Sequence, residues 1–146
     1  TLMRHVIDAS VAAKWFIPED HSELALRLLE GNEELYAPDL LYAEFGNILW
    51  KKQRRGELLR EHAAKAIAGL HAVPLRVHPS KSLLDLALDI ASTLDRSVYD
   101  SLYLSLAFAK DCALVTADRR LYNGLQGTAL QARVMWVEAI SREGTH

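Results

Sequence analysis

The stretch SVYDSLYLSLAFAKDCALVTADRRL, residues 97–121, decides the fold class because it joins a helical pattern to a short apolar run and then to a second helix. Four apolar residues of its first part recur at helical spacing and are predicted to be buried: Val98, Leu102, Leu106 and Ala109. They predict a helix over 98–110, and the run ALVT predicts a strand over 113–116. A short helix is predicted over 119–123.

The rest of the chain repeats this alternation of strands and helices. Further strands are predicted over 4–8, 35–38, 75–78 and 133–137, and further helices over 10–17, 22–31, 39–55, 58–72 and 81–94. Helices of this length between strands act as crossover connections, which join parallel strands. We therefore predict an α/β fold in three layers, with a mostly parallel central sheet and helices on both faces.

Length and composition indicate a single globular domain. The chain has 146 residues, of which 50% are hydrophobic and 25% charged, close to the average of globular proteins. We expect the domain over 3–143 and interpret residues 1–2 and 144–146 as tag-derived or disordered ends. No apolar run approaches the length of a membrane helix, and no signal peptide is recognised. We expect a cytoplasmic protein that does not enter a membrane.

Charge and cysteine content narrow the function classes further. Seventeen Lys and Arg against nineteen Asp and Glu give a net charge of -2, so any binding of nucleic acid must be local. Cys112 is the only cysteine, which excludes disulfides and cysteine-rich zinc sites.

Four acidic residues are candidates for one pocket. Asp8 ends the first predicted strand, and Asp118 follows the fourth by two residues. Ligands of parallel sheets bind beyond the carboxyl ends of the strands, where both aspartates are expected. Asp100 lies in the first turn of helix 98–110, so its side chain can reach the same edge. Glu44 lies on helix 39–55, on a largely apolar face.

Each of these acids also has a purely structural explanation. Asp100 follows Ser97 by three residues, and S-x-x-D resembles a capping box. Asp8 and Asp118 stand where an aspartate commonly caps the next helix. Glu44 alone is typical of a solvated helix residue. Only the combination of the four favours a functional site.

That combination resembles a known family. VIDAS at 6–10, Glu44, VYDSLYLSLA at 98–107 and LVTADRRL at 114–121 together resemble the PIN-domain family, and in it the VapC-type toxins of bacterial toxin-antitoxin pairs. The similarity spans nearly the whole chain and implies a PIN-like fold and an endoribonuclease activity. Asp8, Glu44, Asp100 and Asp118 take the places of the family's acidic residues. Ser10 and Thr116 match its small hydroxyl positions and are expected to support the acids.

Electrostatics explains why such a set of acids needs a cation. Two unit charges 4 Å apart repel by about 4 kcal/mol at an effective dielectric constant near 20. Oxygen ligands without His or Cys favour Mg²⁺ or Mn²⁺. Such an ion acidifies a bound water and neutralises charge on a phosphodiester. We expect Asp8, Asp100 and Asp118 as ligands and Glu44 as the residue that orients water.

The resemblance also implies partners. It implies an RNA substrate, a VapB-type antitoxin that covers the acidic site, and a homodimer. Arg119, Arg120 and Lys14 are candidates for contacts with RNA phosphates. The run KKQRR at 51–55 is interpreted mainly as a solvated helix end that complements the helix dipole.

Two functions from other classes stay open at the level of the sequence. A PIN module without activity could serve only to bind protein or RNA, since folds can keep acids after losing a function. A receiver-like signalling domain would also be doubly wound, with acids at its strand ends. It requires a phosphoacceptor after the third strand, where this chain has His78 and Pro79.

Overall fold

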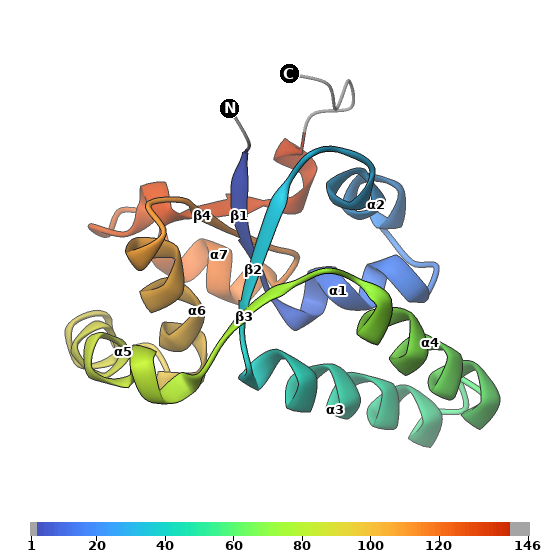
Figure 1. The fold of residues 1–146 in the computed structure, drawn as a ribbon. Helices are drawn as coiled ribbons and strands as arrows, with labels where there is room; N and C mark the ends of the chain where they lie inside the picture. The colour runs from blue at the N-terminus through green and yellow to red at the C-terminus, as the bar shows by residue number, and fades with distance from the viewer. Residues whose placement is uncertain (1–2, 141–146) are drawn as a thin grey trace.

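The computed structural model describes residues 3–140 (Figure 1). The strands of this range are β1 (Arg4–Ile7), β2 (Glu34–Pro38), β3 (Arg76–His78), β4 (Ala113–Thr116) and β5 (Val134–Trp136). The α-helices are α1 (Ala9–Phe16), α2 (Ser22–Glu30), α3 (Leu40–Arg54), α4 (Arg60–Ala72), α5 (Ser80–Leu94), α6 (Val98–Ala109) and α7 (Arg119–Leu125). Two short 3-10 helices follow, η1 (Gln131–Arg133) and η2 (Val137–Ala139).

The strands form one parallel sheet in the order β3-β2-β1-β4-β5. Helices α5 and α6 lie on one side of it and α1 to α4 on the other (Figure 1). The predicted three-layer α/β fold is therefore confirmed. The chain leaves β1 toward β2 and returns across the sheet to β4, so the carboxyl ends of β1 and β4 meet at the switch point of the topology.

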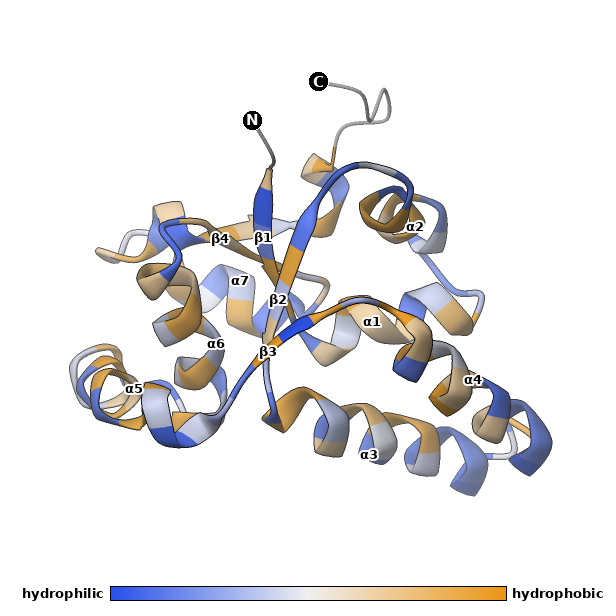
Figure 2. Ribbon diagram, viewed as in Figure 1, coloured by the Kyte–Doolittle hydropathy of each residue, from blue (hydrophilic) through white to orange (hydrophobic). Residues whose placement is uncertain are grey.

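The core lies on both faces of the two central strands. Val6 and Ile7 of β1 and Leu114 and Val115 of β4 are fully buried, which explains why these strands are continuous apolar runs. In Figure 2, hydrophobic residues recur along α3, α5 and α6, whereas the far end of α3 is hydrophilic. The described residues share one hydrophobic core.

Helix α6 is buried differently from the prediction. From Ser101 to Ala107 every residue is buried, because α6 packs against β1, β2 and β4 on one side and α5 on the other. The prediction that Ala109 is buried is wrong: Phe108 and Ala109 are both exposed. Burial in α6 follows depth along the helix axis rather than one helical face.

Most predicted boundaries agree with the structure within two residues. The helix predicted from residue 58 begins at Arg60, because Leu59 is extended at φ −76° and ψ 149°. The strand predicted over 133–137 is shorter, because η1 and η2 take up its ends.

The predictions for residues 1–2 and 144–146, and the predicted domain limit at 143, lie outside the described residues. Within 3–140, no helix combines the length and the apolar character needed to cross a membrane.

Candidate functional site

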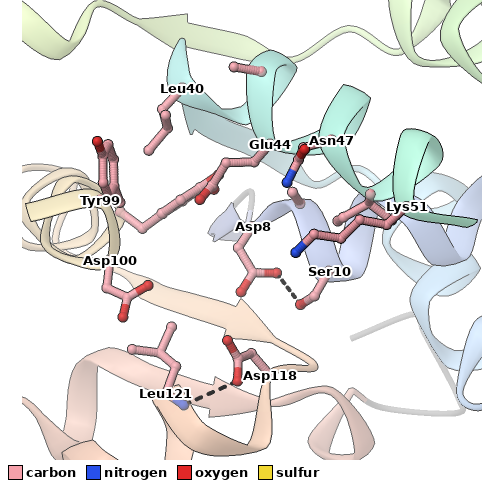
Figure 3. A pocket seen from close by; sticks show the side chains of 14 residues that line it. Asp8, Ser10, Leu40, Glu44, Asn47, Lys51, Tyr99, Asp100, Asp118 and Leu121 are labelled. Carbon is pink, nitrogen blue, oxygen red and sulfur yellow. Dashed lines mark hydrogen bonds between the residues drawn. The ribbon is translucent and has the colours of Figure 1, made fainter. Parts of the chain in front are cut away.

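The four candidate acids line one pocket of about 500 Å³ at the carboxyl edge of the sheet. In Figure 3, Asp8, Asp100 and Asp118 point into the same space, and Glu44 extends into it from α3. They belong to four separate parts of the chain: the ends of β1 and β4, the first turn of α6 and the middle of α3. The structure therefore places all four predicted acids around one space.

Asp8 is fixed by hydrogen bonds to both of its carboxylate oxygens. Oδ1 accepts from Ser10 Oγ at 2.5 Å and from the backbone N–H of Val11 at 3.1 Å. Oδ2 accepts from Thr116 Oγ1. Asp8 is the N-cap of α1 and at the same time lines the pocket, so its capping role does not prevent it from facing the pocket.

Asp118 has a corresponding place after β4. Its Oδ1 accepts the backbone N–H groups of Arg120 and Leu121 at 3.0 and 3.3 Å, which caps α7. Its own N–H donates to Thr116 Oγ1 at 3.0 Å. Ser10 Oγ in turn accepts the N–H of Ala117 at 3.0 Å. The hydroxyls of Ser10 and Thr116 therefore join the loops after β1 and β4, beside Asp8 and Asp118.

Asp100 and Glu44 approach the pocket from helices. Ser97 Oγ accepts the backbone N–H of Asp100 at 3.0 Å, so Ser97 caps α6 and sets the position of its first turn. Tyr103, one turn further along α6, donates from its hydroxyl to Glu44 Oε1 at 2.5 Å. This bond links α3 to α6 across the pocket.

The acids disfavour one another's ionised form. Burial raises the pKa of Asp8 to about 6, and the negative charge of Asp118 adds to this rise. Burial, followed by the charge of Asp118, also raises the pKa of Asp100. The pKa of Glu44 is raised by burial and then by the charges of Asp100 and Asp118. A cation in the pocket would relieve the repulsion among these carboxylates.

The donor set is compatible with a hydrated divalent cation. Within residues 3–140, no three acidic, histidine or cysteine side chains are positioned to ligate one ion together. Mg²⁺ keeps several of its waters in proteins and is commonly bound through one or two carboxylates. Asp8, Asp100 and Asp118 offer only oxygen donors, and the pocket has room for an ion together with its waters.

Several pocket residues were missed or undervalued from the sequence: Asn47, Lys51, Tyr99 and Tyr103. Asn47 and Lys51 follow Glu44 by three and seven residues, so helical spacing places them on the same face of α3. That spacing was the available signal. The interpretation of KKQRR as a solvated helix end holds for Lys51, which is exposed in the last turn of α3 and in addition lines the pocket. It agrees with Arg54, whose guanidinium lies over the exposed Trp50 ring, 4.8 Å from its centroid.

The three predicted phosphate contacts lie in different places. Arg120 is close enough to Asp100 to lower its pKa, in opposition to burial. The Arg119 guanidinium stacks on Trp136 at 4.1 Å from the ring centroid. Lys14 Nζ is 3.3 Å from Glu19 Oε1, in a neighbouring pocket.

A doubly wound parallel sheet that gathers four carboxylates at its switch point defines a class of α/β proteins with an acidic site at the carboxyl edge of the sheet. Comparison with known sequences specifies the class. The sequence model of the PIN domain matches residues 5–124, and the chain belongs to the PIN domain family. This match excludes the receiver-like alternative.

Individual relatives agree with this assignment. The chain is 36% identical over 121 residues to Ribonuclease VapC3 of Pyrobaculum aerophilum. The aligned region covers 82% of this chain and 92% of that protein. A crystal structure from the same organism has a TM-score of 0.69 at 24% identity and covers 93% of this chain and 85% of its own. The structure of VapBC2 from Rickettsia felis, bound to a DNA fragment from its promoter, has a TM-score of 0.66 at 14% identity, with coverage of 92% and 98%. The resemblance to VapC-type proteins is confirmed.

Proposed function

We propose that the chain is an endoribonuclease of the VapC type that uses a divalent metal ion to hydrolyse RNA phosphodiester bonds. The observation that carries the proposal is the convergence of Asp8, Glu44, Asp100 and Asp118 on one pocket. The relatives at 31% identity or more are named as VapC ribonucleases, which supports RNA as the substrate class.

We assign the metal to Asp8, Asp100 and Asp118 and name Mg²⁺ or Mn²⁺ as the ion, because these hard cations prefer oxygen ligands. When bound, the ion would neutralise charge on the phosphodiester and lower the pKa of a water. The chain's own contribution is to hold its carboxylates in place. Ser10 and Thr116 orient Asp8 through the hydrogen bonds described above.

Glu44 is assigned the orientation of the attacking water. Its Oε1 is engaged by the Tyr103 hydroxyl, so the carboxylate is held toward the pocket with Oε2 available to accept a proton from water. The raised pKa of Glu44 makes it a better proton acceptor than an exposed glutamate. Arg120 and Lys14 are retained as phosphate contacts, and Arg119 would have to leave the Trp136 ring to serve as one.

Biological context follows from the relatives. VapC-type proteins are toxins, and the Rickettsia structure contains a VapBC pair, so we propose a VapB-type antitoxin as the protein partner. We also propose a homodimer, which the molar mass from light scattering tests directly. Because the proposed substrate is cellular RNA, we also propose that the protein acts in the cytoplasm.

The central experiment compares RNA cleavage by the native chain and by Asp100→Asn with Mg²⁺ or Mn²⁺. We expect cleavage by the native chain, suppression by EDTA and a loss of about 100-fold or more in the variant, because one charged ligand is removed. Asp89→Asn, an exposed acid on α5, is the matched control and should cleave normally. Equal cleavage by native chain and Asp100→Asn would refute the nuclease assignment, and no cleavage by either would favour a module that only binds.

Metal binding has its own measurement. Titration calorimetry with Mn²⁺ should give weak binding to the native chain that disappears in the Asp8→Asn, Asp118→Asn double variant. Unchanged binding by the double variant would show that the ligands are assigned wrongly.

A further inference from the structure

A second, basic pocket adjoins the acidic one. It has a volume of about 300 Å³ and lies between α1 and α3. Four cationic side chains and one carboxylate line it: Lys14, Lys51, Lys52, Arg55 and Glu19. The two pockets share Ser10, Ile48 and Lys51, so they are continuous along α3. In Figure 3 the Lys51 side chain extends from α3 toward Asp8 and Ser10.

The cations of this basic pocket are only partly neutralised. Glu19 Oε1 is 3.3 Å from Lys14 Nζ, and Glu19 Oε2 is 3.1 Å from Lys52 Nζ. One carboxylate therefore bridges a lysine of α1 and a lysine of α3. Within residues 3–140, neither Lys51 nor Arg55 forms an ion pair. The basic pocket keeps an excess of positive charge next to the four carboxylates.

Lys14 strengthens this interpretation because its side chain is only 10% exposed. A nearly buried ammonium group is costly to desolvate unless anions surround it. Glu19 supplies one anion from a loop position whose side chain is 28% exposed. The carboxylate of Glu19 thus occupies part of a site whose charge and size suit a phosphate group.

We infer that the basic pocket binds the RNA phosphate next to the scissile one. The inference rests on the proposed nuclease function and specifies how that site holds its substrate. Four carboxylates repel a polyanion, so the strand needs compensating cations close to the point of cleavage. Lys51 stands at the boundary of the two pockets, where a strand would pass from one to the other. Glu19 competes with the phosphate for Lys14 and Lys52.

RNA binding tests this directly. The probe is a fluorescent oligouridylate of ten residues, measured by anisotropy in an Asp100→Asn background so that binding is observed without cleavage. The Lys51→Gln, Arg55→Gln double variant should bind about tenfold more weakly, and the slope of log K against log salt should fall by about 0.7 for one lost phosphate contact. Arg54→Gln is the matched control from the same basic run, since Arg54 packs on Trp50, and it should change affinity less than about twofold.

Glu19→Gln provides a test with the opposite sign. Removal of this carboxylate frees two lysines for phosphate, so affinity should rise about threefold or more. Unfolding midpoints of all variants, measured in parallel, separate lost binding from lost folding. A double variant no weaker than Arg54→Gln, or a Glu19→Gln variant with reduced affinity at an unchanged unfolding midpoint, would overturn the assignment.

Substrate length identifies which phosphate is bound. The dinucleotide UpU contains a single phosphodiester and no neighbouring phosphate, so in the otherwise native chain Lys51→Gln, Arg55→Gln should lose about tenfold more in kcat/KM on the oligouridylate than on UpU. An equal loss on UpU would place these cations at the scissile phosphate instead and contradict the inference. If the Lys51→Gln, Arg55→Gln variant bound oligouridylate with native affinity but no longer bound polyglutamate, the pocket would instead be assigned to an acidic protein segment, and the inference would be contradicted. Failure of the native chain to cleave any RNA would refute the nuclease function separately, because the anisotropy measurement does not depend on cleavage.

Discussion

Thr116 donates a hydrogen bond from Oγ1 to Asp8 Oδ2, although the two residues are 108 positions apart in the chain. The pairing of β1 with β4 sets Ile7 opposite Val115, so the next residue of each strand falls at the same edge of the sheet. The same hydroxyl accepts the N–H of Asp118 at 3.0 Å. One fully buried threonine therefore positions two of the acids.

Replacement of this hydroxyl should damage both stability and cleavage. Thr116→Val keeps the shape of the side chain but leaves the N–H of Asp118 without its acceptor and removes one donor from Asp8. We expect a loss of about 1–3 kcal/mol in the free energy of unfolding and about a tenfold lower cleavage rate. Urea titrations and initial rates on RNA measure these effects. Thr116→Ser keeps the hydroxyl and should retain most activity, so similar rates in the two variants would contradict the role of this bond.

The pKa of Asp8 predicts an unusual dependence of stability on pH in the absence of divalent cations. Burial raises this pKa from 3.8 to about 6, so the folded chain favours the protonated carboxyl group. Below pH 3.8 the group is neutral in both folded and unfolded chains and has no effect. Between the two pKa values stability falls as pH rises, and above about pH 6 the full cost persists, at most about 3 kcal/mol.

Asp8→Asn tests this expectation because the amide cannot ionise. Its carbonyl can still accept from Ser10 and Val11, and its NH₂ group can donate to Thr116 Oγ1. In EDTA the variant should be more stable than the native chain at pH 7.5, and the difference should shrink toward pH 4.5. Urea titrations at several pH values measure the difference. If Asp8→Asn is less stable than the native chain at pH 7.5, ionisation of Asp8 does not destabilise the metal-free fold, and the prediction is wrong.

The periodicity of the sequence was sufficient to predict the sheet and three of the four acids at its edge. Asp8 and Asp118 follow directly from the ends of strands, and Asp100 from the first turn of a helix, because these positions depend on local pattern and topology alone. The capping roles were predictable for the same reason. In the structure Asp8 and Asp118 cap helices and also line the pocket, so the two positions are compatible.

Features that depend on packing between distant elements were not accessible from the sequence. The exposure of Ala109 depends on where the sheet and α5 stop covering α6. The bond from Tyr103 to Glu44 joins residues 59 positions apart. The two pockets that share Lys51 form only when α1 packs beside α3. A local pattern indicates which face of a helix a residue occupies, but not what that face meets.

The Tyr103 hydroxyl should affect activity through Glu44. Tyr103→Phe keeps a ring that is only 2% exposed but removes the hydrogen bond to Glu44 Oε1. The carboxylate then loses its fixed orientation, and we expect kcat to fall about three- to tenfold with KM nearly unchanged. Steady-state kinetics on a short RNA measures both constants. Tyr99→Phe is the control, because Tyr99 is 63% exposed at the pocket and its hydroxyl does not orient the Glu44 carboxylate. An equal fall in kcat for Tyr103→Phe and Tyr99→Phe would contradict the proposed role of Tyr103 in orienting Glu44.

Asp39 tests whether Glu44 is correctly chosen as the fourth acid, since it precedes Glu44 by only five residues. Its Oδ1 accepts the N–H of Ser80 at 3.0 Å and the Ser80 hydroxyl at 2.5 Å, so it fixes the start of α5 beside the start of α3. Asp39→Ala should therefore lower the free energy of unfolding by about 1 kcal/mol, with cleavage unchanged, whereas Asp39→Asn should retain most of the stability. Glu44→Gln should show the reverse, a loss of cleavage with little loss of stability. A fall in cleavage by Asp39→Asn at native stability would instead make Asp39 the fourth acid, because the amide keeps the bonds to Ser80 and removes only the charge.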